Sequence, residues 1–261
     1  MPRPPLLLIP PSLGKEVGGR ISAASGSFDH SLAEPRAQVL AALGQIVRSE
    51  DVAVQAKAFK AKGELLDRAV ASAAAVVEHR APLLPSWRRY TGVVWAHLAP
   101  SALPNQCRAR ILVPSGLYGI TKGTDPVADY RLGMQGELGE LGSLRSHWRD
   151  PITDLLVTRL KGRTVFNLLP AEHAQAIDLV RLAASAQLVS VRFVSADGRQ
   201  AVGHHAKAAK GQLARVLLQG GLDAALHFSW DGWTTRLSAN RLDVFAPNHA
   251  ARPSDLSSEH P

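Results

Sequence analysis

Short apolar runs alternate along the chain with longer amphipathic segments, and this alternation limits the possible folds more than any other feature. Apolar runs bounded by glycine or proline are typical of buried strands, whereas apolar residues three or four positions apart indicate helices. The expected strands are 6–9, 110–113, 164–168, 188–195, 225–230 and 234–237, and the expected helices are 34–47, 64–79, 150–161 and 205–218. In the third helix, Asp150 is the expected cap and Pro151 the first residue.

No fixed-period repeat or low-complexity linker divides these segments. We therefore predict an α/β fold of the mixed type, with a single domain over residues 1–246 and a mixed central sheet flanked by helices. The polar tail, residues 247–261, is expected to be disordered.

The charge balance favours anionic partners. The chain has 30 Lys and Arg residues against 22 Asp and Glu residues, a formal net charge of +8. Such an excess is typical of proteins that bind DNA, nucleotides or phosphorylated small molecules. A basic surface that only keeps the protein in solution is an equally good interpretation of charge alone.

The single cysteine and the first residues of the chain indicate the cellular compartment in which the protein is expected. Cys107 is the single cysteine, which excludes an internal disulfide, a thiolate-rich zinc site and a cluster held by this chain's own cysteines. It follows a loop-like segment with no identifiable histidine partner, so it is a poor candidate nucleophile. The apolar stretch near the start is too short for a signal peptide or a membrane span. We expect a cytoplasmic monomer with no membrane association, no metal and no cofactor.

The segment 203–221 carries a basic stripe. If it is helical, Lys207, Lys210, Gly211 and Arg215 lie within about 140 degrees of one another. A glycine inside a helix costs about 1 kcal/mol relative to alanine, so Gly211 implies close approach by another backbone or by a ligand. A phosphate-bearing ligand and an ordinary solvated helix face are both compatible with this spacing. The adjacent histidines that precede the stripe cannot form a metal pair four residues apart.

Residues 111–136, "ILVPSGLYGITKGTDPVADYRLGMQG", combine tight turns with polar donors. The donors are Ser115, Tyr118, Lys122, Tyr130 and Arg131. Glycines after a strand let backbone N–H groups turn toward an anion, and arginine can bind phosphate with two parallel hydrogen bonds. The segment contains neither a dinucleotide-binding fingerprint nor a nucleophile elbow.

The loop after the first strand, "PPSLGKEVGG", contains Lys15 but does not match a phosphate-binding P-loop. Lys15 could contact phosphate as a point charge, or it could be a solvated loop lysine.

Seven segments, in order, resemble the YaaA family of bacterial peroxide-stress proteins. They are "LLLIPPSLGK", "RRYTGVVW", "SGLYG", "DPVADYRLGM", "HWRDPITDLL", "VFNLLPAEH" and "HAKAAKGQLAR". The resemblance implies an α/β domain with a basic cleft, a helix-hairpin-helix-like element, binding to duplex or distorted DNA, and a role in limiting oxidative damage. The matching positions that it implies as cleft residues are Lys15, Ser115, Tyr118, Asp125, Tyr130, Arg131, Trp148, Asn167, Glu172, Lys207 and Lys210.

The chain departs from the family pattern at several of these segments. An Arg-Pro pair before Asp125 is replaced by Lys122-Gly123-Thr124, and Gly133 stands where a charged residue is usual. Pro170 and His173 replace a serine and a tyrosine that flank the family's glutamate. These changes allow a specialised relative whose cleft binds a different ligand.

Two functions therefore stay open. The first is a DNA-binding stress protein that uses Lys15, Ser115, Lys122, Arg131, Lys207, Lys210 and Arg215 on phosphates. The alternative is an enzyme of specialised metabolism acting on a nucleotide, a nucleoside or another small anionic substrate. In the enzyme, Tyr118, Arg131, Glu172 and His173 would be the catalytic candidates, although the residue type favours a structural role for His173.

Overall fold

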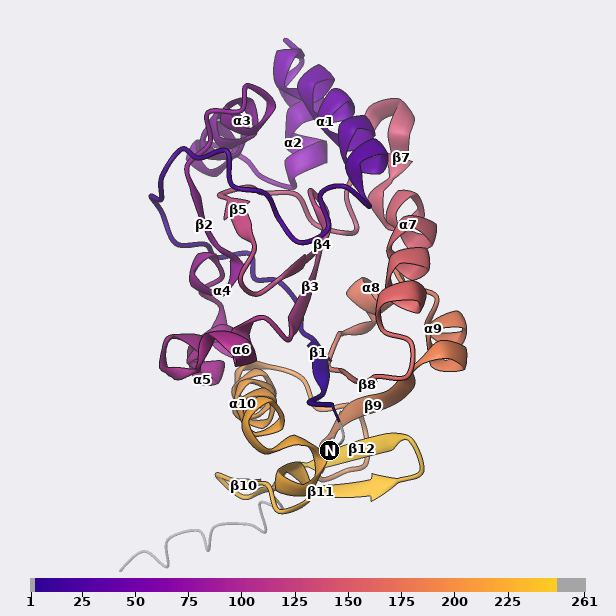
Figure 1. Cartoon of the computed structure of the whole chain (residues 1–261). Helices are drawn as coiled ribbons and strands as arrows, with labels where there is room; N and C mark the ends of the chain where they lie inside the picture. The colour runs from indigo at the N-terminus through magenta and orange to yellow at the C-terminus, as the bar shows by residue number, and fades with distance from the viewer. Residues whose placement is uncertain (1–2, 248–261) are drawn as a thin grey trace, which may run out of the picture.

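The computed structural model describes residues 3–247, and its centre is an eight-stranded mixed sheet (Figure 1). Its strand order is β10 (Ser229–Trp230), β11 (Trp233–Ser238), β12 (Arg241–Phe245), β9 (Gln187–Val194), β8 (Thr164–Asn167), β1 (Leu6–Leu8), β3 (Ile111–Ser115) and β4 (Gly119–Lys122). The five strands from β12 to β3 are parallel, and β4, β10 and β11 pair antiparallel. The predicted mixed α/β fold is confirmed.

Every residue of β1 and β3 is buried, which explains why these two strands are apolar almost throughout. Leu6 and Leu8 of β1 point to one core, whereas Leu7 and Ile9 point to the other. The same alternation places Val165 and Phe166 of β8 in opposite cores. These runs were predictable because a parallel strand covered on both sides needs apolar side chains on both sides.

Helices cover the two faces of the sheet (Figure 1). One core is closed by α1 (Ala33–Arg48), α2 (Val52–Phe59), α3 (Glu64–Val77), α7 (Leu144–Arg159) and α9 (Leu179–Ser185). The other is closed by α5 (Val93–Leu98), α6 (Asn105–Arg108) and α10 (His204–Leu226). The remaining elements are β2 (Leu83–Pro85), α4 (Ser86–Arg89), η1 (Pro100–Ala102), β5 (Pro126–Ala128), β6 (Glu137–Leu138), η2 (Gly139–Leu141), β7 (Gly142–Ser143) and α8 (Ala171–Ala174).

The predicted start of α7 is wrong. The helix begins at Leu144, capped by the Ser143 hydroxyl, and Pro151 lies inside it rather than at its first position. Leu144, Trp148 and Ile152 recur every four residues, and all three are fully buried. Burial of this stripe outweighs the cost of a proline within the helix.

The predicted strand at 225–230 is also wrong over most of its length. Helix α10 continues to Leu226, and only Ser229 and Trp230 pair as β10. Gly221 interrupts the helical conformation with a φ of 68°, which a glycine adopts without strain. The buried methyl group of Ala225 then packs in the core below α10 rather than in the sheet.

Apart from Pro247, the expected tail 247–261 lies outside the described residues. Within residues 3–247, no helix has the length and apolar character needed to cross a bilayer.

The arrangement of parallel strands places the candidate site residues. β1 lies between β3 and β8, so the chain leaves these three neighbouring strands at the same edge of the sheet. Ser115 ends β3, Asn167 ends β8, and the loop that carries Lys15 follows β1. In parallel sheets, ligands bind outside this carboxyl edge, where connections from neighbouring strands diverge.

Candidate functional site

Lys15 is the centre of the site at the carboxyl edge. Its Nζ lies 4.3 Å from the ring centre of Tyr130 and 5.7 Å from that of Tyr90, and it donates a hydrogen bond to the carbonyl of Ser12 at 3.1 Å. The backbone of Lys15 forms an antiparallel bridge with Tyr90, which fixes the loop beside α4. The lysine is therefore held over two tyrosine rings, and its position in space is defined.

Arg89 holds the loop that carries Lys15 through hydrogen bonds to its backbone. Its guanidinium group is completely buried and donates to the carbonyls of Val127, Gly18 and Pro82 at 3.2, 3.0 and 2.9 Å, and also to that of Glu16. These bonds connect the loop after β1 to β2 and β5. Burial lowers the pKa of Arg89, but the four carbonyl acceptors satisfy the charge that it retains.

Burial also determines the charge state of Lys15. It lowers the pKa of Lys15 to about 8, with Arg131, Arg89 and Arg68 adding to the effect and Asp129 opposing it. Asp129 is itself bound by Arg68 at 2.8 Å. The positive charges around Lys15 are thus only partly compensated, and an incoming anion would raise the pKa of Lys15 back toward its ordinary value.

A chain of buried hydroxyl groups lies next to Lys15. The Ser115 Oγ is 2.7 Å from the Tyr130 hydroxyl, which is 2.9 Å from the Tyr90 hydroxyl. Ser115 Oγ also accepts hydrogen bonds from the backbone N–H groups of Leu117 and Tyr118.

Counting donors and acceptors shows that the cluster keeps one free donor. The two backbone N–H groups fill both acceptor positions of Ser115, so Ser115 donates its proton to Tyr130. Tyr130 and Tyr90 share one hydrogen bond in which either hydroxyl can be the donor, so one of their two protons has no acceptor among residues 3–247. Burial raises the pKa of Tyr130 to about 12 and that of Tyr90 well above its ordinary value, so both stay protonated. The pair therefore offers one donor to a ligand beside Lys15.

Lys210 forms a second cationic position at the same edge. Its Nζ donates to the carbonyl of Leu168, directly after β8, at 2.9 Å, and lies 5.4 Å from the ring centre of Phe193. Burial, then Lys207, lowers the pKa of Lys210 to about 8, while Glu172 opposes the shift. Lys207 is exposed one turn earlier on α10.

His173 and Glu172 accompany Lys210. The His173 Nε2 lies 3.5 Å from a carboxylate oxygen of Glu172, and its buried Nδ1 has no hydrogen-bond partner within residues 3–247. Burial lowers the pKa of His173, with Glu172 opposing and Lys210 adding to the effect. A neutral imidazole beside a lysine can accept a proton, so His173 and Lys210 can take part in chemistry as well as in binding.

Close packing against α5 explains why residue 211 is a glycine. A Cβ atom at this position would collide with the carbonyl of Val94 and would lie 2.7 Å from the His97 Cβ and 2.9 Å from the Leu98 nitrogen. The gap in the basic stripe is therefore filled by α5, so of the two expected reasons for Gly211 it is the close approach of another backbone that applies.

Trp148 and Asp125 hold the fold. Trp148 is 0% exposed, donates to the carbonyl of Gly116 at 2.9 Å, and leaves no room for a Cβ atom at Gly119. Its complete burial gives it no surface to line a cleft. Asp125 accepts from Ser27 at 2.6 Å and from the backbone of Lys122 at 2.8 Å, so it clamps its own turn to the loop after β1.

Three further predicted residues have structural partners. Arg131 donates to the carbonyls of Phe59 and Lys60 at the end of α2, at 3.2 and 3.4 Å. Asn167 accepts from the backbone of Leu169 at 3.1 Å, and the Lys122 ammonium lies 5.5 Å from the Phe28 ring. Their roles toward a ligand stay predictions.

Tyr118 and Arg215 complete the predicted set. The Tyr118 hydroxyl accepts from the backbone of Ala128 at 3.0 Å, and its ring meets that of Tyr130 edge-on at 5.8 Å. Arg215 is half-buried on α10, two turns after Lys207. The expected basic cleft and the helix-hairpin-helix-like element likewise stay predictions.

The residue types alone did not single out Tyr90 or Arg89. Both lie in "RRYTGVVW", one of the seven segments that carry the family resemblance, but neither is among the residues that the resemblance implies for the cleft. Trp95 of the same segment is a core residue, 2% exposed. Arg89 and Tyr90 contact the Lys15 loop across more than 70 positions of sequence, which no local pattern reveals.

Comparison with known proteins agrees with the sequence resemblance. The chain matches the family model described as "Peroxide stress protein YaaA" over residues 6–236. A UPF0246 protein of Streptomyces coelicolor is 32% identical over 222 residues, covering 83% of this chain and 84% of that protein. A UPF0246 protein of Corynebacterium glutamicum is 30% identical over 254 residues, covering 94% and 96%. These matches extend over nearly the whole chain, and the protein therefore belongs to the YaaA family of peroxide stress proteins.

Proposed function

We propose that this protein takes part in peroxide stress by binding DNA at the carboxyl edge of its sheet. The observation that carries the proposal is the placing of Lys15 and Lys210 at this edge, each with its pKa lowered to about 8 by burial. Within residues 3–247, neither lysine forms an ion pair with a carboxylate. A phosphate would supply the missing counter-charge, and the exposed Lys207 would extend the contact along the backbone.

The double variant Lys207→Ala plus Lys210→Ala tests this function. Each lost phosphate contact should reduce the slope of log K against log salt by about 0.9, so we expect a slope smaller by about 2 and weaker duplex binding. Fluorescence anisotropy with a labelled duplex at several salt concentrations measures both quantities.

A matched control removes the same charge elsewhere. Arg159 and Lys161 are exposed and precede β8, at the opposite edge of the sheet. Their double alanine variant should bind DNA with the salt slope of the unmodified protein. Equal affinity and slope in the Lys207/Lys210 variant would contradict the proposed function.

A second function has its own supporting observation. The free proton of the Tyr90–Tyr130 pair and the lowered pKa of Lys15 place a donor and a proton-exchanging amine side by side. Such a pair suits an enzyme that acts on a nucleotide, a nucleoside or another small anionic substrate. Binding of DNA requires cations but does not require this chain of hydroxyl groups.

Tyr90→Phe separates the two functions, because it keeps the aromatic ring and removes one of the two hydroxyl groups that share the free donor proton. A hydrogen bond to a charged group contributes about 1.5–3 kcal/mol, so affinity for a small phosphate ligand should fall about tenfold or more. Thermal-shift titration with nucleotides, nucleosides and short DNA provides the measurement. If small ligands bind the Phe variant as well as the unmodified protein, the enzyme interpretation loses its support, and DNA binding should be little changed in either case.

A further inference from the structure

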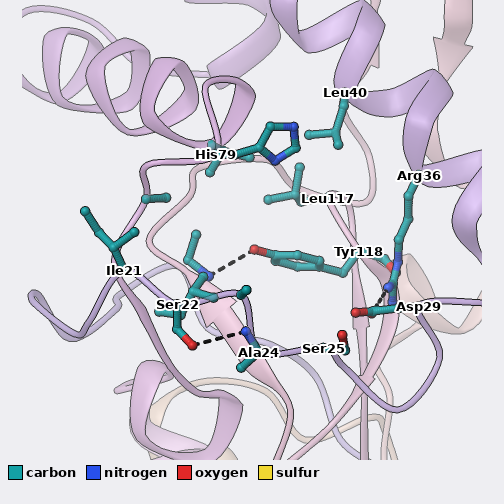
Figure 2. A pocket seen from close by; sticks show the side chains of 15 residues that line it. Ile21, Ser22, Ala24, Ser25, Asp29, Arg36, Leu40, His79, Leu117 and Tyr118 are labelled. Carbon is teal, nitrogen blue, oxygen red and sulfur yellow. Dashed lines mark hydrogen bonds and ion pairs between the residues drawn. The ribbon is translucent and has the colours of Figure 1, made fainter.

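A cavity of about 730 Å³ lies away from the lysines, under the loop that follows β1. Residues 21–25 form one wall, and the opposite walls come from α1, the end of α3, β2 and β5 (Figure 2). A volume of several hundred cubic ångströms is typical of sites for small organic molecules. Neither proposed function uses this cavity.

The walls of the cavity are mainly apolar. Leu40, Val76, Leu83 and Leu117 line it, and Figure 2 shows Leu40 and Leu117 close to one another across from the 21–25 loop. Ile21 lies at the rim and is 68% exposed. An apolar ligand would remove all of these surfaces from water, at about 25 cal/mol for each square ångström buried.

The charged groups in the walls are already neutralised by each other. Arg36 donates to the carbonyls of Tyr118 and Ile120 at 3.0 and 3.2 Å and forms an ion pair with Asp29. Asp29 also accepts from the backbone of Gly26 at 2.6 Å. Neither charge is available to balance an ionic ligand, so the cavity favours a neutral one.

Tyr118 supplies a directional contact in the wall of the cavity. Its hydroxyl oxygen accepts from Ala128, and no group within residues 3–247 accepts its proton. Figure 2 shows the ring of Tyr118 reaching into the circle of lining side chains, with its hydroxyl toward the 21–25 loop. Burial raises the pKa of Tyr118, which keeps it a donor at neutral pH. A donor in an apolar wall selects a ligand that carries an acceptor.

We propose that this cavity binds a neutral, mainly apolar small molecule whose carbonyl oxygen accepts the hydrogen bond of Tyr118. The edge-on contact between Tyr118 and Tyr130 places the ligand one aromatic ring away from the Lys15 site. The proposal does not depend on DNA binding, because it uses none of the lysines.

Acetophenone and ethylbenzene form a matched pair of probes, since they differ in the carbonyl group but have similar size. Titrated into the full chain and followed by ¹H–¹⁵N spectra, acetophenone should shift the backbone amides of residues 21–25, Leu117 and Ala128. One neutral hydrogen bond contributes about 1 kcal/mol, so acetophenone should bind roughly fivefold more tightly than ethylbenzene.

Two variants and a control complete the test. Tyr118→Phe should remove the preference for acetophenone, and Ala81→Trp, which fills the cavity from its wall, should abolish binding of both probes. Ala71→Trp, on an exposed position of α3, should bind as the unmodified protein does. If the Phe variant does not fold, Ala81→Trp still decides the result. Absence of amide shifts in the folded, unmodified protein, or equal shifts in Ala81→Trp, would overturn the proposal.

Discussion

Gly211→Ala should lower the free energy of unfolding by about 2 kcal/mol. The added methyl group would meet the backbone of α5 at Val94 and Leu98, and backbone atoms cannot rotate away as a side-chain end can. Overpacking costs about 1–3 kcal/mol or more, and the better helix propensity of alanine returns about 1 kcal/mol of this. For a chain of this size, the melting temperature should fall by roughly 4–8 °C in a thermal denaturation experiment.

Gly133→Ala is the matched control for this effect. No heavy atom lies within 4 Å of the Cβ position at Gly133, and its backbone is not in the left-handed region. The melting temperature of this variant should stay close to that of the unmodified protein. Equal stability of the Gly211 and Gly133 variants would mean that α5 and α10 can move apart without cost.

The sheet was the most predictable part of the fold. β1 and β3 are apolar at nearly every position because helices cover both of their faces, and β8 and β9 carry apolar pairs that reach both cores; these patterns are visible in a single sequence. β12 was missed because Arg241 and Asp243 interrupt its apolar pattern. Asp243 is tolerated in the sheet because Arg192 and Arg241 bind it at 2.8 and 3.1 Å, a compensation that depends on a neighbouring strand.

The candidate site was predictable only in part. Lys15, Ser115 and Tyr130 could be named because glycines, prolines and cations around strand ends indicate loops suited to anions, and Lys210 because it lies on the basic stripe of a predicted helix. The sequence did not reveal which of them meet. The hydroxyl contacts of Tyr130 with Ser115 and with Tyr90 span 15 and 40 positions of sequence, which no local pattern records.

Lys15→Met should raise the free energy of unfolding at pH 7 by about 2 kcal/mol while it weakens binding of the anionic ligand. The lysine is protonated at this pH in both the folded and the unfolded chain, but burial makes the charge costly only in the folded chain. The ring of Tyr130 at 4.3 Å offsets part of this cost, which is why the expected gain is smaller than the full pKa shift implies. Methionine keeps the length of the side chain and can pack on the same rings.

The difference in stability between the unmodified protein and Lys15→Met should depend on pH. Between about pH 8, where the folded chain releases the Lys15 proton, and pH 10.5, where the unfolded chain does so, the unfolded state holds more protons. The unmodified protein should therefore gain stability relative to Lys15→Met as the pH rises through this range, and the difference of about 2 kcal/mol at pH 7 should shrink toward pH 10. Urea denaturation at pH 7, 8.5 and 9.5 measures it, with Lys62→Met as the control because Lys62 is exposed. A Lys15 variant that loses stability at pH 7 would show that the lysine supports the fold, whereas a gain in stability combined with weaker binding would identify a charge that is kept for its ligand.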